Sequence, residues 1–282
     1  MHRPRRLIVF TDLDGSLLDY HTYSMEAAGP ALHRLDELGC PLVIVSSKTR
    51  AEVDALTGLP AKPLVFITEN GSGVYVHQDM SVEQSSPPEI AGEYSVLRLG
   101  SAYADILRCL DEAQKTCRVV IHGFSSMSTS EVSTLTGLDL NAAERAKARE
   151  FSEPFLFKGT ADGFRLLTQA LERSGMRCLK GDRFWHAIGS RCDKGVAVRK
   201  AFAIFRENYP GTIWKSIALG DSPSDVPMLE AADTAVIIQR HDGTSIDYRA
   251  KASQTVIRSQ DAGPVGWNKV ILELTEEREG HG

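Results

Sequence analysis

The chain has 282 residues, of which 42% are hydrophobic and 24% are charged, as in ordinary globular proteins with one large domain or two modest ones. Its formal net charge of -5, without a long basic tract, argues against a nucleic-acid partner, because a phosphate backbone calls for a clustered cationic surface. A small-molecule partner is therefore the better expectation.

The cysteines and the amino-terminal segment indicate the compartment in which the protein works. The five cysteines are odd in number and no two have the two-residue spacing of a redox or zinc pair, so we expect reduced thiols in a cytoplasmic protein. The apolar run at residues 7–10 is too short for the core of a signal peptide, and nothing approaches a membrane span. We expect no membrane contact, and a monomer or a small homo-oligomer.

The first part of the chain alternates strand patterns with helical patterns. Ser24 is the expected N-cap of a helix that ends at Gly39, and Thr49 with Glu52 forms the capping box of a second helix. Runs of β-branched and other apolar residues, typical of strands covered on both faces, occupy residues 6–12, 41–47 and 63–71. This alternation predicts a doubly wound, Rossmann-like parallel sheet.

The pattern weakens between about residues 80 and 190, where residues 81–94 have the composition of a connector. It then resumes with helices expected near 193–208, 223–232 and 265–277 and strands near 216–222 and 234–239. We therefore expect an α/β fold in which residues 1–82 and 190–282 form the core and residues 83–189 form an inserted α/β cap domain.

Polar groups follow the expected strands of the core. Asp12 and Asp14 come after the first strand, Ser46 after the second and Asp221 after "SIALG", while Lys194 opens a helix. Ligands of open α/β sheets bind outside the carboxyl ends of the strands, so we expect these groups to converge. Two carboxylates close together repel one another unless a cation lies between them. Acids, a hydroxyl and an amine together predict a site for a phosphate and Mg²⁺.

Each of these groups has an expected role. Mg²⁺ would be held by Asp12, Asp221 and the main-chain carbonyl of Asp14. Asp12 would attack phosphorus and form an aspartyl-phosphate, and Asp14 would first protonate the leaving oxygen and then deprotonate the attacking water. Ser46 and Lys194 would bind the phosphate oxygens.

Two neighbouring positions would support this site. Gly15 allows a sharp turn after the acidic pair. Asp225 is expected to orient the metal ligands from behind, although it could simply cap the following helix.

The segments "DLDGS", "SSKTR", "DKG" and "GDSPSD" occur in the order of the four motifs of the haloacid dehalogenase superfamily, and the chain resembles that superfamily. Longer stretches such as "ENGSGVYV" and "GDRFWHAIGSRCDKG" are similar to the mannosyl-3-phosphoglycerate phosphatases over nearly the whole chain. The resemblance implies a Mg²⁺-dependent phosphomonoesterase that converts mannosyl-3-phosphoglycerate into mannosylglycerate and phosphate.

The chain departs from the family pattern at three positions. Ser16 stands where threonine is common, which keeps the hydroxyl. Ser224 stands where asparagine is expected, which shortens a side chain near Asp221. Asp182 replaces a glycine and places a negative charge beside Arg183, with which it could pair.

Substrate-contacting residues are expected from two regions. Three lie at strand ends of the core, namely Lys48, Glu69 and Asn70, and three lie in the cap, namely Arg165, Arg183 and His186. We expect the two arginines to recognise the glycerate carboxylate and sugar hydroxyls, because a planar guanidinium matches a carboxylate. "ENGSG" is equally compatible with a plain hairpin turn, and His186 beside Trp185 with a packed side chain.

Other functions fit part of this pattern. A phosphatase of glucosyl-3-phosphoglycerate or of another phospho-sugar would carry the same motifs, and so would a sugar phosphomutase. A receiver module also places acids, a hydroxyl and a lysine around a phosphorylated aspartate, but it has no use for a cap of about a hundred residues.

Overall fold

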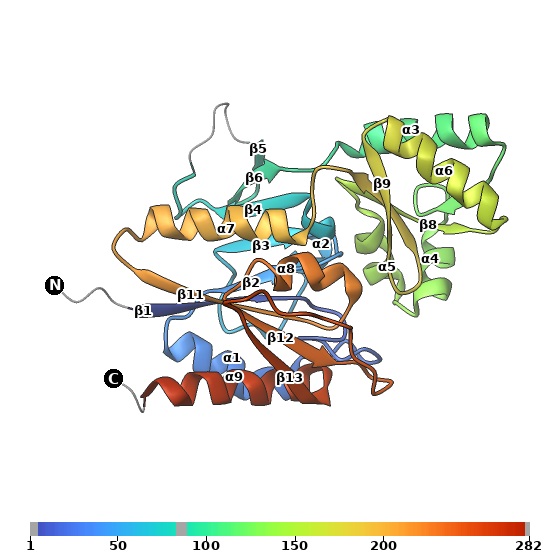
Figure 1. Cartoon of the computed structure of the whole chain (residues 1–282). Helices are drawn as coiled ribbons and strands as arrows, with labels where there is room; N and C mark the ends of the chain where they lie inside the picture. The colour runs from blue at the N-terminus through green and yellow to red at the C-terminus, as the bar shows by residue number, and fades with distance from the viewer. Residues whose placement is uncertain (1–4, 83–88, 280–282) are drawn as a thin grey trace.

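The computed structural model describes residues 5–82 and 89–279, with side chains as far as residue 276. It contains two β-sheets, each with its own helices (Figure 1). The larger sheet has nine strands in the order β13-β12-β11-β1-β2-β3-β4-β6-β5. In chain order these are β1 (Arg5–Thr11), β2 (Leu42–Val45), β3 (Val65–Thr68), β4 (Gly73–His77), β5 (Glu89–Ala91), β6 (Tyr94–Arg98), β11 (Ile213–Gly220), β12 (Thr234–Gln239) and β13 (Thr255–Ala262).

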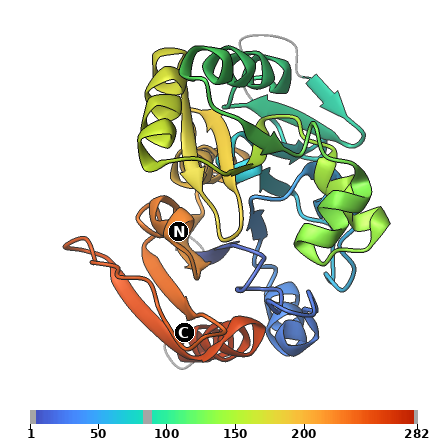
Figure 2. The ribbon, with the colours of Figure 1, turned by 90° about the vertical axis from the view of Figure 1, so that its right-hand side faces the viewer.

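The strands from β13 to β3 run parallel to their neighbours, whereas β4, β6 and β5 pair antiparallel. Strand β1 lies inside this sheet and buries both of its faces. Leu7 and Val9 pack on one side with α1 (Gly29–Glu37) and α9 (Gly263–Glu279), which lie side by side in Figures 1 and 2. Ile8 and Phe10 pack on the other side with α7 (Lys194–Asn208) and α8 (Val226–Leu229). The expected doubly wound α/β core is confirmed.

The cap is a four-stranded sheet in the order β7-β8-β10-β9. Its strands are β7 (Ile121–Gly123), β8 (Ser152–Phe157), β9 (Met176–Lys180) and β10 (Trp185–Gly189). Helices α3 (Tyr103–Cys117) and α6 (Ala161–Arg173) pack on it through residues such as Ile106 and Leu167. A second small apolar cluster joins α4 (Thr129–Thr136) and α5 (Leu140–Lys147).

The border between core and cap differs from the expected residue 83. Strands β5 and β6 belong to the core sheet, so on the amino-terminal side the cap begins only after Arg98. β5 is exposed along most of its length, which explains why its sequence lacks the buried-strand pattern. On the carboxyl-terminal side the cap ends with Gly189, next to the expected border. Part of the expected connector lies at residues 83–88, outside the described residues.

Two helix starts test the sequence analysis in opposite ways. The capping box of Thr49 and Glu52 is present at the start of α2 (Arg50–Asp54). Ser24, in contrast, is not the N-cap of α1: a 3₁₀ turn at Glu26–Ala28 precedes α1, and Ser24 only accepts a bond from the Glu26 N–H at 3.2 Å. Pro30 explains the later start, because a proline has no N–H to donate and fits the first turn of a helix.

Strand β13 and the antiparallel β4–β6 pairing were not among the expected elements. β13 mixes exposed and half-buried positions, so it lacks the continuous apolar run of the inner strands. In the described part of the chain, no helix has both the length and the apolar character needed to cross a membrane.

Candidate active site

A buried lysine lies between two carboxylates at the carboxyl edge of the core sheet. Asp12 directly follows β1, Asp225 lies in the short turn after β11, and Lys194 is the first residue of α7. The Lys194 Nζ atom donates to Asp12 Oδ1 and to Asp225 Oδ1, each at 2.6 Å. All three side chains are buried, so these charge-assisted bonds hold the three groups in one arrangement.

Asp221, which follows β11, completes an acidic cluster. Carboxylate oxygens of Asp12, Asp221 and Asp225 lie within 4.8 Å of one another. Burial raises the pKa of Asp12 to about 7 in spite of the Lys194 ammonium, and burial with the charges of Asp225 and Asp12 raises the pKa of Asp221 to about 8. Three acids thus face one lysine, and an added cation would relieve their repulsion.

The donor atoms of this cluster fit a small divalent cation. Asp221 Oδ1 is buried and has no hydrogen-bond partner among the described residues. Asp225, in contrast, is fully engaged, because its Oδ2 accepts from the backbone N–H groups of Asp221 and Ser222 at 3.2 and 3.0 Å and from the Ser222 hydroxyl at 2.8 Å. Asp225 therefore orients the cluster, and Asp12 and Asp221 are the carboxylates open to a metal.

Gly15 explains how the chain passes this cluster. Its φ of +81° is a left-handed conformation, and a Cβ at this position would lie 2.8 Å from Asp221 Oδ2. β1 ends at Thr11, and residues 12–18 form turns, so Asp12 and Asp14 do not lie on one extended segment. Both acids still line the same cleft, because the glycine turn returns the chain to it.

Asp14 is held by a lysine that sequence analysis assigned to the substrate. Lys48 Nζ lies 3.0 Å from Asp14 Oδ1 and 3.6 Å from a carboxylate oxygen of Glu52. Although burial opposes it, these two acids raise the pKa of Lys48 above its usual value. Lys48 is therefore a charged group that positions Asp14 at the cleft.

Ser46 and Asn70 meet at the ends of β2 and β3. Ser46 is buried, its Oγ accepts from the Lys48 N–H at 3.2 Å, and its carbonyl accepts from the Asn70 N–H at 3.0 Å. Among the described residues, Ser47 and Asn70 line the cleft and Ser46 does not. The Asn70 amide nitrogen is buried without a partner in the described chain, and β3 and β4 form the hairpin that the Asn-Gly pair suggested.

Glu69 joins the core to the cap. Its buried carboxylate accepts from the Glu150 N–H at 2.9 Å, the Phe151 N–H at 3.1 Å and the Ser152 hydroxyl at 2.6 Å. The side chain does not line the cleft in the described chain, so its position argues against the expected contact with the substrate. Glu69 therefore links the end of β3 in the core to the segment that enters β8 in the cap.

The three expected cap residues lie in different surroundings. Arg165 is exposed on α6, 3.4 Å from Asp162, and lines no described cleft near Asp12, so its position argues against substrate contact. Arg183 donates to the Thr136 carbonyl at 2.5 Å and lines a smaller cleft of about 170 Å³. His186 lines both clefts, and burial with the charges of Arg149 and Lys194 lowers its pKa to about 3, which keeps it neutral.

The expected pairing of Asp182 with Arg183 is not present. Asp182 Oδ1 accepts from Arg240 Nη2 at 2.9 Å and Asp182 Oδ2 accepts from the Tyr20 hydroxyl at 2.6 Å. Arg183 instead donates to the backbone carbonyl groups at the end of α4, and Asp182 binds the two core side chains.

A cleft of about 460 Å³ between core and cap is lined by Asp12, Asp14, Lys194 and Asp221 together with Asn70, Asp182 and His186. Several residues of this cleft were not among the expected site residues, namely Tyr20, Ser47, Lys180, Ser222 and Arg240. Arg240 carried a usable signal, because it directly follows the apolar run "TAVIIQ" and therefore lies at the carboxyl edge of the sheet. The contribution of Tyr20 depends on cap contacts that no local pattern encodes.

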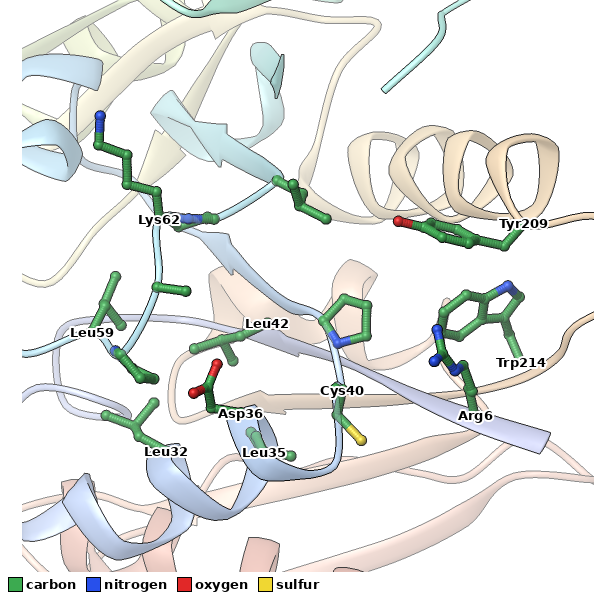
Figure 3. A pocket seen from close by; sticks show the side chains of 16 residues that line it. Arg6, Leu32, Leu35, Asp36, Cys40, Leu42, Leu59, Lys62, Tyr209 and Trp214 are labelled. Carbon is green, nitrogen blue, oxygen red and sulfur yellow. The ribbon is translucent and has the colours of Figure 1, made fainter. Parts of the chain in front are cut away.

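A second cavity, of about 230 Å³, lies at the opposite edge of the sheet (Figure 3). Arg6, Leu42 and Trp214 line it from the starts of β1, β2 and β11, together with Leu35 and Cys40. Among the residues that the structure describes, it shares none of its lining with the cleft that contains Asp12, so it is separate from the acidic cluster.

The comparisons with known proteins agree with this geometry. A family model for haloacid dehalogenase-like hydrolases matches residues 9–98. The glucosyl-3-phosphoglycerate/mannosyl-3-phosphoglycerate phosphatase of Methanococcoides burtonii is 38% identical over 95% of this chain and 96% of its own length. The chain belongs to this phosphatase family. The protein of the same name from Persephonella marina is 34% identical over 97% of the chain and 98% of its own length.

Solved structures support the fold of this phosphatase. A crystal structure of a Thermoplasma acidophilum protein has a TM-score of 0.65 at 18% identity and covers 97% of this chain and 99% of its own. A superfamily phosphatase from Bacteroides thetaiotaomicron has a TM-score of 0.61 at 16% identity over 96% of this chain and 95% of its own. The resemblance to the haloacid dehalogenase superfamily is thus confirmed in both sequence and fold.

Proposed function

We propose that this phosphatase hydrolyses mannosyl-3-phosphoglycerate to mannosylglycerate and phosphate with Mg²⁺ as cofactor. The observation that carries the proposal is the buried arrangement of Asp12, Lys194, Asp221 and Asp225 at the carboxyl edge of the sheet, in a chain 38% identical to a phosphatase named for both the glucosyl and the mannosyl compound. Glucosyl-3-phosphoglycerate is therefore a second expected substrate.

Asp12 is the proposed nucleophile. Lys194 binds its Oδ1, so Oδ2 is the oxygen that would attack phosphorus. The new bond between Asp12 and phosphorus forms while the ester bond between phosphorus and the glycerate oxygen breaks. Lys194, which lines the cleft, remains a proposed ligand of the phosphate oxygens. Ser46 is proposed beside it at the end of β2, although its neighbour Ser47 and not Ser46 lines the cleft in the described chain.

Asp14 is the proposed acid and base. It gives its proton to the departing glycerate oxygen in the first step, and in the second step it takes a proton from a water molecule that attacks the phosphorus. The bond between phosphorus and Asp12 then breaks, which releases phosphate and restores both carboxylic groups. Lys48, 3.0 Å from Asp14, would keep that side chain at the cleft through both steps.

Mg²⁺ would be held by Asp12, Asp221 and the carbonyl of Asp14, as the unpartnered Asp221 oxygen suggests. When bound, it would reduce the repulsion between the phosphate and the carboxylates. We further propose a cytoplasmic protein, in keeping with five cysteines that form no disulfide in the described chain, and a monomer or small homo-oligomer, which light scattering would test.

The test is an assay of inorganic phosphate release. Mannosyl-3-phosphoglycerate, glucosyl-3-phosphoglycerate and mannose 6-phosphate are compared by kcat/KM with Mg²⁺ and with a chelator. We expect one phosphate per glycerate ester consumed, preference for the two glycerate esters, and loss of activity on chelation that Mg²⁺ restores. Rearranged sugar phosphate without free phosphate would instead identify a phosphomutase.

A further inference from the structure

A carboxylate of the cap is bound at the mouth of the cleft by two side chains of the core. Asp182, in the loop between β9 and β10, has its Oδ1 2.9 Å from Arg240 Nη2 and its Oδ2 2.6 Å from the Tyr20 hydroxyl. Each oxygen therefore has its own donor, and one donor is a guanidinium. This is the donor set that a bound carboxylate ligand requires.

Both donors also have contacts within the core. The Tyr20 ring stacks on the His241 ring with centroids 3.8 Å apart and planes at 9°. The Arg240 N–H donates to the Thr244 carbonyl at 2.9 Å, and the Arg240 carbonyl accepts from the Gly243 N–H at 2.9 Å, so a closed turn holds the start of the guanidinium side chain. A preformed pair of donors binds a ligand with little loss of conformational entropy.

The pair lies beside the acidic cluster. Arg240 Nη1 is 3.8 Å from Asp221 Oδ2, and Tyr20, Arg240 and Asp12 line the same cleft. Within residues 5–82 and 89–279, Arg240 is the one arginine that lines this cleft. A three-carbon acid with its phosphate at Asp12 can therefore place its carboxylate near Arg240, because the two positions share Asp221 as a neighbour.

We propose that Tyr20 and Arg240 form the binding site for the carboxylate of the substrate, and that Asp182 fills this site when no substrate is bound. This inference rests on the proposed function, whose substrate carries a carboxylate at the end of its three-carbon unit opposite the phosphate. Substrate binding exchanges one carboxylate for another on the same donors, and the cap loop that contains Asp182 is released.

The exchange can be distinguished from a simple latch between core and cap. Although burial opposes it, the bonds from Tyr20 and Arg240 lower the pKa of Asp182, so its carboxylate is charged and competes with an anionic ligand. If Asp182 competes, removal of its charge tightens the binding of a carboxylate ligand. If Asp182 is instead a latch needed for cap closure, the same change weakens binding.

The experiment is calorimetric titration of the full chain with Mg²⁺ present and with Asp12→Asn to prevent turnover. The two probes are 3-phosphoglycerate and glycerol 3-phosphate. The first has a carboxylate at the position where the second has a hydroxymethyl group. We expect about tenfold or greater preference for 3-phosphoglycerate, lost in Arg240→Gln and reduced several-fold in Tyr20→Phe. Asp182→Asn should bind 3-phosphoglycerate several-fold more tightly, and each variant should change the affinity for glycerol 3-phosphate much less than the affinity for 3-phosphoglycerate.

Arg165→Gln is the matched control, because Arg165 also pairs with an aspartate but lies away from the cleft, and its affinities should equal those of the parent. Circular dichroism checks folding, and Arg240→Lys, which keeps the charge and loses the fork, replaces Arg240→Gln if that variant does not fold. Equal binding of the two probes, binding of neither, or weaker binding by Asp182→Asn would overturn the inference. These titrations need no phosphate release, so their result is independent of the assay that tests the proposed function.

Discussion

The proposed metal ligand Asp221 lies against a glycine from a distant part of the chain. Gly15 has a positive φ, and a methyl group there would lie 2.8 Å from Asp221 Oδ2. Gly15→Ala should therefore lower Mg²⁺ affinity about tenfold or more by displacing a ligand, in addition to a loss of about 1 kcal/mol from the strained backbone. Magnesium titration followed by calorimetry, with melting of the metal-free protein, measures both effects.

Gly39→Ala is the matched control for this change. Gly39 also has a positive φ, of +57°, but beyond its chain neighbours no heavy atom of the described residues lies within 4 Å of its Cβ position. It should lose a similar amount of stability and keep its Mg²⁺ affinity. Equal Mg²⁺ affinities in the two variants would show that Gly15 does not position Asp221.

The titration of Asp12 and Asp221 predicts how stability depends on pH. Folding raises the pKa of both groups from 3.8 to about 7 and about 8, so the folded state binds more protons than the unfolded state between these values. These two groups should therefore stabilise the metal-free protein most below pH 4. Their contribution to the free energy of unfolding should be lost as the pH rises to about 8. Bound Mg²⁺ should offset this loss, so the rise in Tm on adding Mg²⁺ should grow with pH.

Thermal melting between pH 5 and pH 9, with a chelator and with Mg²⁺, checks this expectation. The difference in Tm between the parent and Asp221→Asn isolates the contribution of the cluster from that of other titrating groups. A metal-free difference that does not change with pH would contradict the raised pKa values.

Among the secondary-structure elements, the core and the cap are joined by hydrogen bonds to one buried carboxylate. Glu69, after β3, accepts three hydrogen bonds at the start of β8. Glu69→Gln removes the charge and leaves at least one buried donor facing an amide NH₂, which should cost about 2 kcal/mol. For a chain of 282 residues that corresponds to a fall in Tm of about 3–4 °C, measurable by calorimetry.

Glu131→Gln is the control for Glu69→Gln. Glu131 also accepts backbone and hydroxyl hydrogen bonds, from Ser128, but it is exposed at the start of α4. Its replacement should change Tm much less. A similar change in both variants would show that the contacts of Glu69 with the cap do not stabilise the protein.

The core elements were predictable because their local signals agree with the fold. β1, β3 and β12 are continuous apolar runs inside the sheet, and the Thr49 and Glu52 capping box starts α2 as expected. The edge strand β5 and the late start of α1 were not predictable in the same way. Exposure removes the apolar pattern from β5, and Pro30 shifts the start of α1 past the apparent N-cap.

In the molecule as a whole, the acidic cluster could be predicted from the topology of the sheet, whereas the contacts between core and cap could not. The carboxyl ends of parallel strands share one edge, so Asp12 and Asp221 could be brought together from sequence alone. The contact of Tyr20 with Asp182 joins residues 162 positions apart on two domains, and only the docking of the cap creates it. For the same reason, the sequence alone could not show that the side chains of Arg165 and Glu69 do not line the cleft in the described chain.

In the proposed reaction, Asp12 carries the phosphoryl group between substrate and water. The most direct measurement is rapid acid quenching of the enzyme during turnover of mannosyl-3-phosphoglycerate, followed by peptide mass spectrometry. We expect a phosphoryl group on the peptide that contains Asp12, present only while substrate remains and absent from Asp12→Asn. A phosphoryl group on a different residue, or turnover by Asp12→Asn above about a thousandth of the parent rate, would contradict the claim.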